Sequence, residues 1–285
     1  MTDIIFSFDT EDFTSCRAAD AILREAQVLT ENGVVGCFCI VGHLADQLVS
    51  WNRTDVLEAL SHHEIHNHSL AHSMHPTINE YTDIEDANEA ISRVIEKETL
   101  ANEKISAATG IKRFYAAVPP GNSKSYAAMY AYAKMGFPIY ADTVCDTVRS
   151  EGVHYCNIFH TKYTVSFETL LIHNKNTDLD ELLDKLSKMP RAIIYTHPNV
   201  ATHTEWWDLL NYNGENKHPF GEWEKCKERP REEEEAFYSG IGKLVKKIKS
   251  DKRFRITTYT ELAGELGREG KRIIKRRYKN ELAYL

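Results

Sequence analysis

The sequence predicts an α/β fold, specifically a distorted and incomplete (β/α) barrel of about seven parallel strands. Short apolar runs alternate with helical segments along the chain, which is typical of parallel sheets whose crossovers are helices. The runs are apolar almost throughout, as expected of strands that are covered on both faces. The length of 285 residues suits one such barrel, because barrels of about 250 residues are commonly single domains.

The predicted strands are short and lie between segments with apolar residues at helical spacing. We expect the strands, in chain order, at 4–8, 34–41, 63–68, 113–118, 137–141, 167–172, 192–196 and 254–258. We expect the helices at 17–31, 44–49, 54–61, 83–109, 123–135, 178–189, 232–250 and 259–266. One alternating pattern therefore accounts for nearly the whole chain.

Glycine and proline mark the ends of several predicted helices. Gly33, Gly110 and Gly136 each follow a helical segment, where glycine readily adopts the left-handed conformation that ends a helix. Pro190 ends the helix at 178–189, because proline cannot continue the helical hydrogen bonding. The helix at 232–250 begins acidic and ends basic, which is the polarity that the helix dipole favours.

The chain is predicted to form a single domain over residues 1–285, since no change of composition divides it. At about 199–231 the composition shifts to Trp, Asn, Gly, Pro and charged residues, which indicates a loop-rich insertion. Ordered loops of this length are often functional. A basic segment at about 268–285 ends the chain.

Composition narrows the classes of function. Hydrophobic residues make up 42% and charged residues 27%, as in an ordinary globular protein, and the net charge of −7 gives no reason to expect nucleic acid as a partner. No apolar run approaches the roughly 20 residues that span a bilayer. No signal peptide precedes the first strand, so we expect a cytoplasmic protein. The six cysteines form no Cys-x-x-Cys pair, which favours reduced thiols.

Histidines concentrate in one short segment. Six of the 13 in the chain lie there, at His62, His63, His66, His68, His72 and His75. The spacing His68-Ser69-Leu70-Ala71-His72 allows two imidazoles to face one point in space. The outer histidines lack this spacing. His66 lies on the same strand face as His68. It is a supporting partner, an alternative ligand, or a histidine in contact only with solvent or the core.

Carboxylates follow the first predicted strand directly. Asp9, Glu11 and Asp12 lie at its end, where α/β folds display catalytic groups. One carboxylate together with His68 and His72 would make a three-ligand site for a divalent metal ion, most simply zinc. The histidine segment and the acidic strand end therefore predict one hydrolytic metal site.

These motifs resemble the polysaccharide deacetylase family, also called the NodB-homology domain. The resemblance spans roughly residues 3–266. Phe8-Asp9-Thr10-Glu11-Asp12 is similar to the family's first motif, and Asn67-His68-Ser69-Leu70-Ala71-His72 is similar to its second, which is the most specific of them. The runs 36–42 and 254–257 resemble the family's second and closing strands.

The resemblance implies a role for each site residue. Asp9 would be the general base, His197 the general acid, and Glu11, His68 and His72 the metal ligands. Which of Asp9, Glu11 and Asp12 is ligand and which is base stays open, because Thr10 stands where many members have the ligand aspartate. Substrate contacts are expected from three further residues, Pro120 in the third motif and Trp206 and Trp207 in the insertion.

The third motif departs from the family pattern. Its arginine, which pairs with the base, is replaced by Ala117 in the run Ala117-Val118-Pro119-Pro120-Gly121. Another cation, Arg113 or Lys124, would have to hold the base ionised, or none does.

The leading hypothesis is a metal-dependent hydrolase that removes the acetyl group from an amino sugar in a polysaccharide or glycan precursor. One alternative is cleavage of a small non-sugar amide on the same fold. The other is a non-catalytic metal-binding or carbohydrate-binding module, which the missing arginine would suit. The expected partners are a carbohydrate or small amide and a divalent ion; the sequence leaves a homo-oligomer open.

Overall fold

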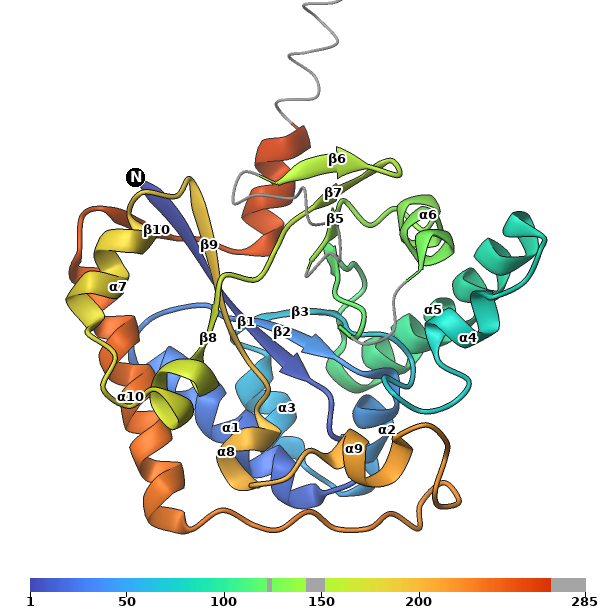
Figure 1. Ribbon diagram of the computed structural model, residues 1–285, viewed down its shortest axis with the longest axis horizontal. Coiled ribbons are helices and arrows are strands. Elements are labelled where there is room, and N and C mark those ends of the chain that lie inside the picture. The colour runs from blue at the N-terminus through green and yellow to red at the C-terminus, as the bar shows by residue number, and fades with distance from the viewer. Residues whose placement is uncertain (122–124, 142–151, 268–285) are drawn as a thin grey trace, which may run out of the picture.

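A computed structural model describes residues 1–121, 125–141 and 152–267 of the protein (Figure 1). The sheet has the order β6-β7-β5-β4-β3-β2-β1-β9-β8, with β10 also paired to β1, and every pairing is parallel except that of β6 with β7. The sheet curls without closing, which confirms the predicted distorted and incomplete (β/α) barrel.

The strands are mostly two to four residues long, and only β1 and β9 are longer. Their bounds are β1 Thr2–Thr10, β2 Cys37–Ile40, β3 Glu64–Asn67, β4 Ala116–Ala117, β5 Ile139–Tyr140, β6 Val153–Tyr155, β7 Ile158–His160, β8 Val165–Ser166, β9 Arg191–Thr196 and β10 Phe254–Ile256. The helices are α1 Cys16–Glu31, α2 Gly42–Ser50, α3 Thr54–Leu60, α4 Ile78–Thr82, α5 Ala87–Thr109, α6 Tyr126–Lys134, η1 Thr169–His173, α7 Leu179–Leu186, α8 Asn199–Thr202, α9 Trp207–Tyr212 and α10 Arg231–Ser250. Residues 259–267 are also helical.

Strand β1 is the centre of the sheet. It pairs with β9 along one edge, and along the other with β10 near its amino end and with β2 near its carboxyl end. Alternate side chains of a strand face opposite ways. Ile4, Phe6 and Phe8 therefore pack in the outer core against the helices, while Ile5 packs in the inner core within the curl. The same alternation places Asp9 on the inner face.

The inner core is small and is filled from several strands and from the last helical segment. Its members include Ile5, Cys39, Val118, Ile139, Ile193, Tyr259 and Leu262. Because the curl is packed at this level, groups that meet ligands must lie at the ends of the strands.

One predicted element is wrong. The run 167–172 was expected to be a strand, but β8 ends at Ser166, and Thr169–His173 forms a π-helix, η1. Short apolar runs do not distinguish a strand from a helix by periodicity. Among the described residues, no helix is both long and apolar enough to cross a membrane.

The packing predicts a large effect for one core truncation. Phe38 on β2 is fully buried and stacks on Phe8, with ring centroids 4.5 Å apart. We expect Phe38→Ala to lower the free energy of unfolding by about 3–5 kcal/mol, because it leaves a cavity between sheet and helices. Urea unfolding measures this change. Val49→Ala, at a side chain that is 58% exposed, is the control and should stay within about 0.5 kcal/mol of the wild type. A loss below about 1 kcal/mol for Phe38→Ala would contradict this packing.

Candidate metal and catalytic site

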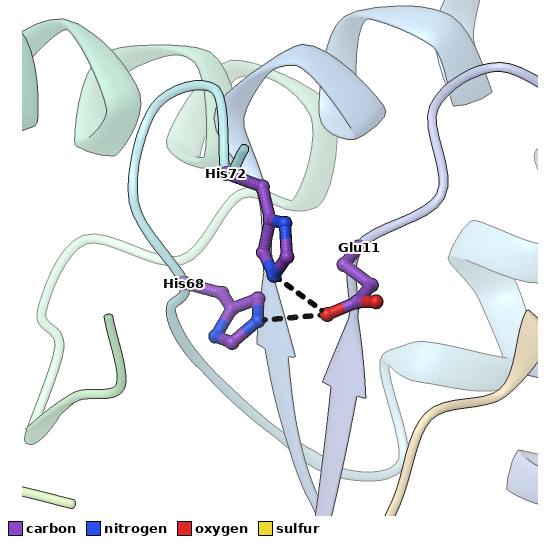
Figure 2. Close-up of side chains that lie close together, drawn as sticks. All are labelled: Glu11, His68 and His72. Atoms are coloured by element: carbon purple, nitrogen blue, oxygen red, sulfur yellow. Dashed lines mark hydrogen bonds and ion pairs between the residues drawn. The ribbon is translucent and has the colours of Figure 1, made fainter. Parts of the chain in front are cut away.

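Three side chains meet at the carboxyl ends of β1 and β3. Figure 2 shows Glu11, from the segment after β1, pointing toward His68 and His72, which follow β3. Oε2 of Glu11 lies 2.8 Å from Nε2 of His72 and 3.3 Å from Nε2 of His68. All three residues are buried. Burial alone would raise the pKa of Glu11. His72 and His197 together lower it by more than burial raises it, so the pKa of this carboxyl lies well below its usual value.

A strained loop brings the two imidazoles together. Ser69 and His72 have φ values of 69° and 49°, in the left-handed region that non-glycine residues seldom adopt. Side-chain bonds hold this conformation: Oδ1 of Asn67 accepts from the Ser69 N–H at 2.9 Å, and Oγ of Ser69 accepts from the His72 N–H at 3.1 Å. Asn67 in turn donates to Glu98 on α5 at 3.1 Å. The loop is therefore fixed to β3 and α5 at several points.

The partners of the imidazoles suit ligation through Nε2. Nδ1 of His68 bonds to the carbonyl oxygen of Val118, to which it must donate. Nδ1 of His72 lies 2.8 Å from Oγ of Ser73, which itself donates to Oδ2 of Asp208 at 3.1 Å. A proton on Nδ1 leaves the lone pair on Nε2 for a metal, as is usual for ligating histidines. The donor set of two imidazoles and one carboxylate fits a divalent ion.

A second group of donors within the described residues does not meet this criterion. Cys37, Glu64 and His66 also lie close together. The backbone N–H of Tyr115, however, points at Nδ1 of His66 at 3.4 Å, so Nε2 carries the proton and donates to Glu64 at 3.0 Å. Glu64 also accepts from the backbone N–H of Thr260 at 3.1 Å. This group fixes the start of the last helical segment, and His66 is not a supporting partner of His68.

Asp9 is held by a tyrosine that the sequence analysis missed. The Tyr163 hydroxyl donates to Oδ1 of Asp9 at 2.5 Å, and the Tyr163 ring stacks on Tyr195 with centroids 4.3 Å apart. Burial raises the pKa of Asp9, although His68, His197 and Tyr163 each act to lower it. No spacing rule points to Tyr163, because it lies in an irregular segment before β8.

The cations proposed to replace the missing arginine do not reach Asp9. Ala117 packs in the outer core, on the face of β4 away from Asp9. Arg113 precedes the amino end of β4 and lies over the Tyr115 ring, 4.8 Å from its centroid. Lys124 lies outside the described residues. In the part of the chain that the structure describes, the partners of Asp9 are the phenol of Tyr163 and the imidazole of His197.

His197 follows β9 and lies between two carboxylates. Its Nε2 is 3.8 Å from Oδ2 of Asp9, and its Nδ1 is 3.1 Å from Oε1 of Glu168. Glu168 also accepts from the His197 backbone N–H at 2.6 Å and from the Thr196 hydroxyl at 2.9 Å. Glu168 directly precedes η1, and a π-helix is often found at a functional site. The mistaken strand prediction at 167–172 hid this residue.

Asp12 is separate from the other carboxylates. Its Oδ1 accepts from the backbone N–H of Thr14 at 2.9 Å and from the Thr14 hydroxyl at 2.7 Å, which shapes the turn into α1. Burial raises the pKa of Asp12 to about 7, against the bonds from Thr14. Among the three acidic residues after β1, Glu11 is therefore the one that meets the imidazoles, and Asp9 is the one beside His197.

The predicted substrate contacts lie in different environments. Trp206 is 39% exposed, and its ring lies edge-on to His197 with centroids 5.1 Å apart, as a residue at a substrate rim would. Trp207 is fully buried, and its indole N–H donates to Oε1 of Glu11 at 3.0 Å. A direct substrate contact by Trp207 was therefore wrong, because its ring is enclosed behind the donor carboxylate. Pro120 is buried at the end of the described segment that follows β4.

Comparison with known proteins supports the fold. The chain has the fold of a protein from Mycobacterium smegmatis that is provisionally named a polysaccharide deacetylase, with a TM-score of 0.58 and 12% identity over 94% of this chain and 91% of that one. A CE4 family pseudoenzyme and a family 4 carbohydrate esterase, both from Bacillus anthracis, match 92% of this chain and 65% and 83% of theirs, at 16% and 18% identity and TM-scores of 0.48. No family profile and no curated protein matches the sequence.

The geometry distinguishes ligand histidines from their neighbours. We expect His68→Ala and His72→Ala to lose a stoichiometric divalent ion, because a three-ligand site rarely keeps useful affinity with two ligands. His62→Ala and His75→Ala should keep it; His75 bonds instead to Glu80 at 2.8 Å. Elemental analysis of protein incubated with zinc and then desalted measures the content. Full zinc content in the His72 variant would refute the site.

The charge of His197 can be tested in the metal-free protein. Burial lowers its pKa, but Glu11, Glu168 and Asp9 raise it to about 10. We expect ring NMR signals of His197 to remain those of an imidazolium through neutral pH, and Glu168→Gln to lower the pKa. Because the pKa is raised from an ordinary value of about 6.5, protonation of His197 stabilises the folded state. This stabilisation is fully present below pH 6.5 and is lost as pH rises through about 10. Titration of His197 near pH 6 would show that the carboxylates do not face it.

Proposed function

We propose that the protein is a metal-dependent amide hydrolase of the polysaccharide deacetylase type, which removes the acetyl group from an amino sugar. The observation that carries this proposal is the convergence of Glu11, His68 and His72 beside the Asp9–His197 pair, at the carboxyl ends of the barrel strands. The fold shared with the M. smegmatis protein supports it. Function rests on the site, because a fold alone accommodates many reactions.

Glu11, His68 and His72 would hold the ion through one carboxylate oxygen and two Nε2 atoms. We propose zinc, because a site of two imidazoles and one carboxylate with room for further ligands is typical of hydrolytic zinc centres. When bound, the ion supplies a Lewis acid that polarises an amide carbonyl and makes water more acidic. The protein supplies the remaining proton transfers.

Asp9 and His197 are placed to act as base and acid. Tyr163 binds Oδ1 of Asp9, so Oδ2 is the oxygen that can take a proton from attacking water. Nδ1–H of His197 donates a hydrogen bond to Glu168. The proton on Nε2 then faces the side of Asp9 and is the one that the departing amine can take. A carboxylate and an imidazolium held close together in this way provide both proton transfers of amide hydrolysis.

A sugar substrate is supported by the surface beside the site. Trp206 offers a partly exposed aromatic ring next to His197, and such rings stack on sugar faces. We therefore favour an oligosaccharide or polymer over the small-amide alternative.

Acetate release tests the proposal. Purified protein is treated with chelator and assayed with and without added zinc on N-acetylglucosamine oligomers and on a panel of small amides. We expect zinc-dependent release from the oligomers. Release from small amides alone would replace the sugar substrate by the alternative. Binding of oligomers without release from any compound would support a non-catalytic module.

The base assignment gives a matched pair of variants. We expect Asp9→Asn to keep the ion and to lower turnover by roughly 10²–10⁴-fold, the usual contribution of a positioned base. Asp12→Asn is the control, since an amide oxygen can still accept the two bonds from Thr14. Zinc content and turnover are measured together. Loss of zinc in Asp9→Asn would make Asp9 a ligand.

One variant suggested by the missing motif arginine is unsuitable. Ala117→Arg would place a charge in the outer core rather than beside Asp9, because Ala117 is fully buried on that face. Tyr163→Phe is the informative change, because it removes the bond to Asp9 while keeping the ring that stacks on Tyr195.

A further inference from the structure

Two consecutive residues at the start of α9 reach two of the three metal donors. Trp207 donates to Oε1 of Glu11 at 3.0 Å. Asp208 accepts at Oδ2 from the Ser73 hydroxyl at 3.1 Å, and Oγ of Ser73 lies 2.8 Å from Nδ1 of His72. Helix α9, in orange in Figure 1, lies in the segment expected to be a loop-rich insertion, more than a hundred residues from these donors in the sequence.

The indole of Trp207 sets the rotation of the Glu11 carboxylate. It is fully buried and packed edge-on against Phe13 at 4.9 Å and against Tyr212 at 5.7 Å between ring centroids, so its N–H has a fixed direction. Because this N–H binds Oε1, the other oxygen, Oε2, faces His68 and His72. Glu11 is thereby held as a donor through one oxygen.

The hydroxyl of Ser73 connects His72 to a carboxylate. A hydroxyl that donates to Asp208 can only accept from the imidazole, so Nδ1 of His72 carries a proton and Nε2 presents its lone pair. The Asp208 carboxylate, as the acceptor at the end of this chain of bonds, holds the Nδ1 proton of His72 in place. Nδ1 of His68 also carries a proton, because it donates to the carbonyl oxygen of Val118.

The segment around α9 is attached to the histidine loop at further points. Asn216 binds both backbone groups of His75, accepting from its N–H at 2.8 Å and donating to its carbonyl at 2.8 Å. Nε2 of His75 lies 2.9 Å from the carbonyl oxygen of Tyr212. The loop that carries His72 and the segment that carries Asp208 therefore form one hydrogen-bonded unit over the site.

We propose that α9 sets the metal affinity of the site, with Trp207 and Asp208 as positioning residues for Glu11 and His72. This inference rests on the proposed function only in requiring a divalent ion at the three donors; it does not depend on which amide is cleaved. Neither residue touches the ion. Their contribution is to hold an oxygen and a ring nitrogen in the orientation and protonation state that ligation requires.

Zinc affinity, measured by competition with a chromogenic chelator, tests the proposal in the whole protein. We expect Asp208→Ala, which removes the acceptor, and Ser73→Ala each to weaken zinc binding by about 10- to 100-fold, as loss of an outer partner of a ligating histidine does. Since both act through one chain of bonds, the double variant should be little weaker than either single variant. Trp207→Phe, which keeps an aromatic ring but loses the donor, should also weaken binding.

Asn216→Ala is the matched control, because it breaks two hydrogen bonds that also join the two segments and leaves the chain of bonds to His72 intact. It should bind zinc as the wild type does. Thermal unfolding of the metal-free variants shows whether each one is folded. Wild-type affinity in Asp208→Ala, or equal weakening in Asn216→Ala, would overturn the positioning role while leaving the metal site in place. Absence of zinc binding by the wild type would overturn both this inference and the proposed metal site, whereas zinc binding without hydrolysis would overturn only the proposed reaction.

Discussion

The buried negative charge of Glu11 is the constraint on which the site depends. A carboxylate removed from water is stable only when opposite charge and hydrogen-bond donors surround it. Six buried carboxyl groups among the described residues illustrate this rule. The pKa is lowered at Glu11 and Glu168, each of which contacts an imidazole. Burial instead raises the pKa of Asp9, Asp12, Glu25 and Glu98. Charge is thus concentrated where histidines can balance it.

The position of this charge follows from the alternation of β1. Asp9 faces the inside of the curl, and Thr10 turns away, with its hydroxyl on the carbonyl of Phe8 at 3.0 Å. The side chain of Glu11 lies on the same side as that of Asp9, and its greater length lets it reach His72 in the loop after β3. One intervening residue therefore separates Asp9, the proposed base, from Glu11, the proposed ligand, while both stay on one face. This geometry accounts for the Asp-Thr-Glu order in physical terms.

The sequence pointed to the candidate site residues that follow a strand or belong to one short motif. Asp9 and Glu11 follow a strand, His68 and His72 have a characteristic spacing, and His197 follows another strand. Their supporting residues were not predictable in this way. Tyr163, Glu168, Trp207 and Asp208 come from irregular segments or short helices, and each is brought to the site by tertiary folding across a long stretch of chain. Trp207 illustrates the difficulty, because an aromatic residue with a polar N–H suits a substrate rim and a buried hydrogen bond equally well.

Tyr163 also gives the site an electrostatic character of its own. An arginine beside the base, as the family resemblance implies, would favour the ionised carboxylate permanently, because guanidinium stays charged. A phenol donates a bond but carries no charge, so it orients Asp9 without fully offsetting the effect of burial on its pKa. Under the proposed roles, ionisation of Asp9 would come from His197 and from a cation at Glu11, His68 and His72, which would lower the pKa of nearby carboxyls. The proposed base would then become fully effective only when the metal is bound, so that proton acceptance by Asp9 would depend on occupancy of the metal site. A fixed arginine would make Asp9 less dependent on the metal.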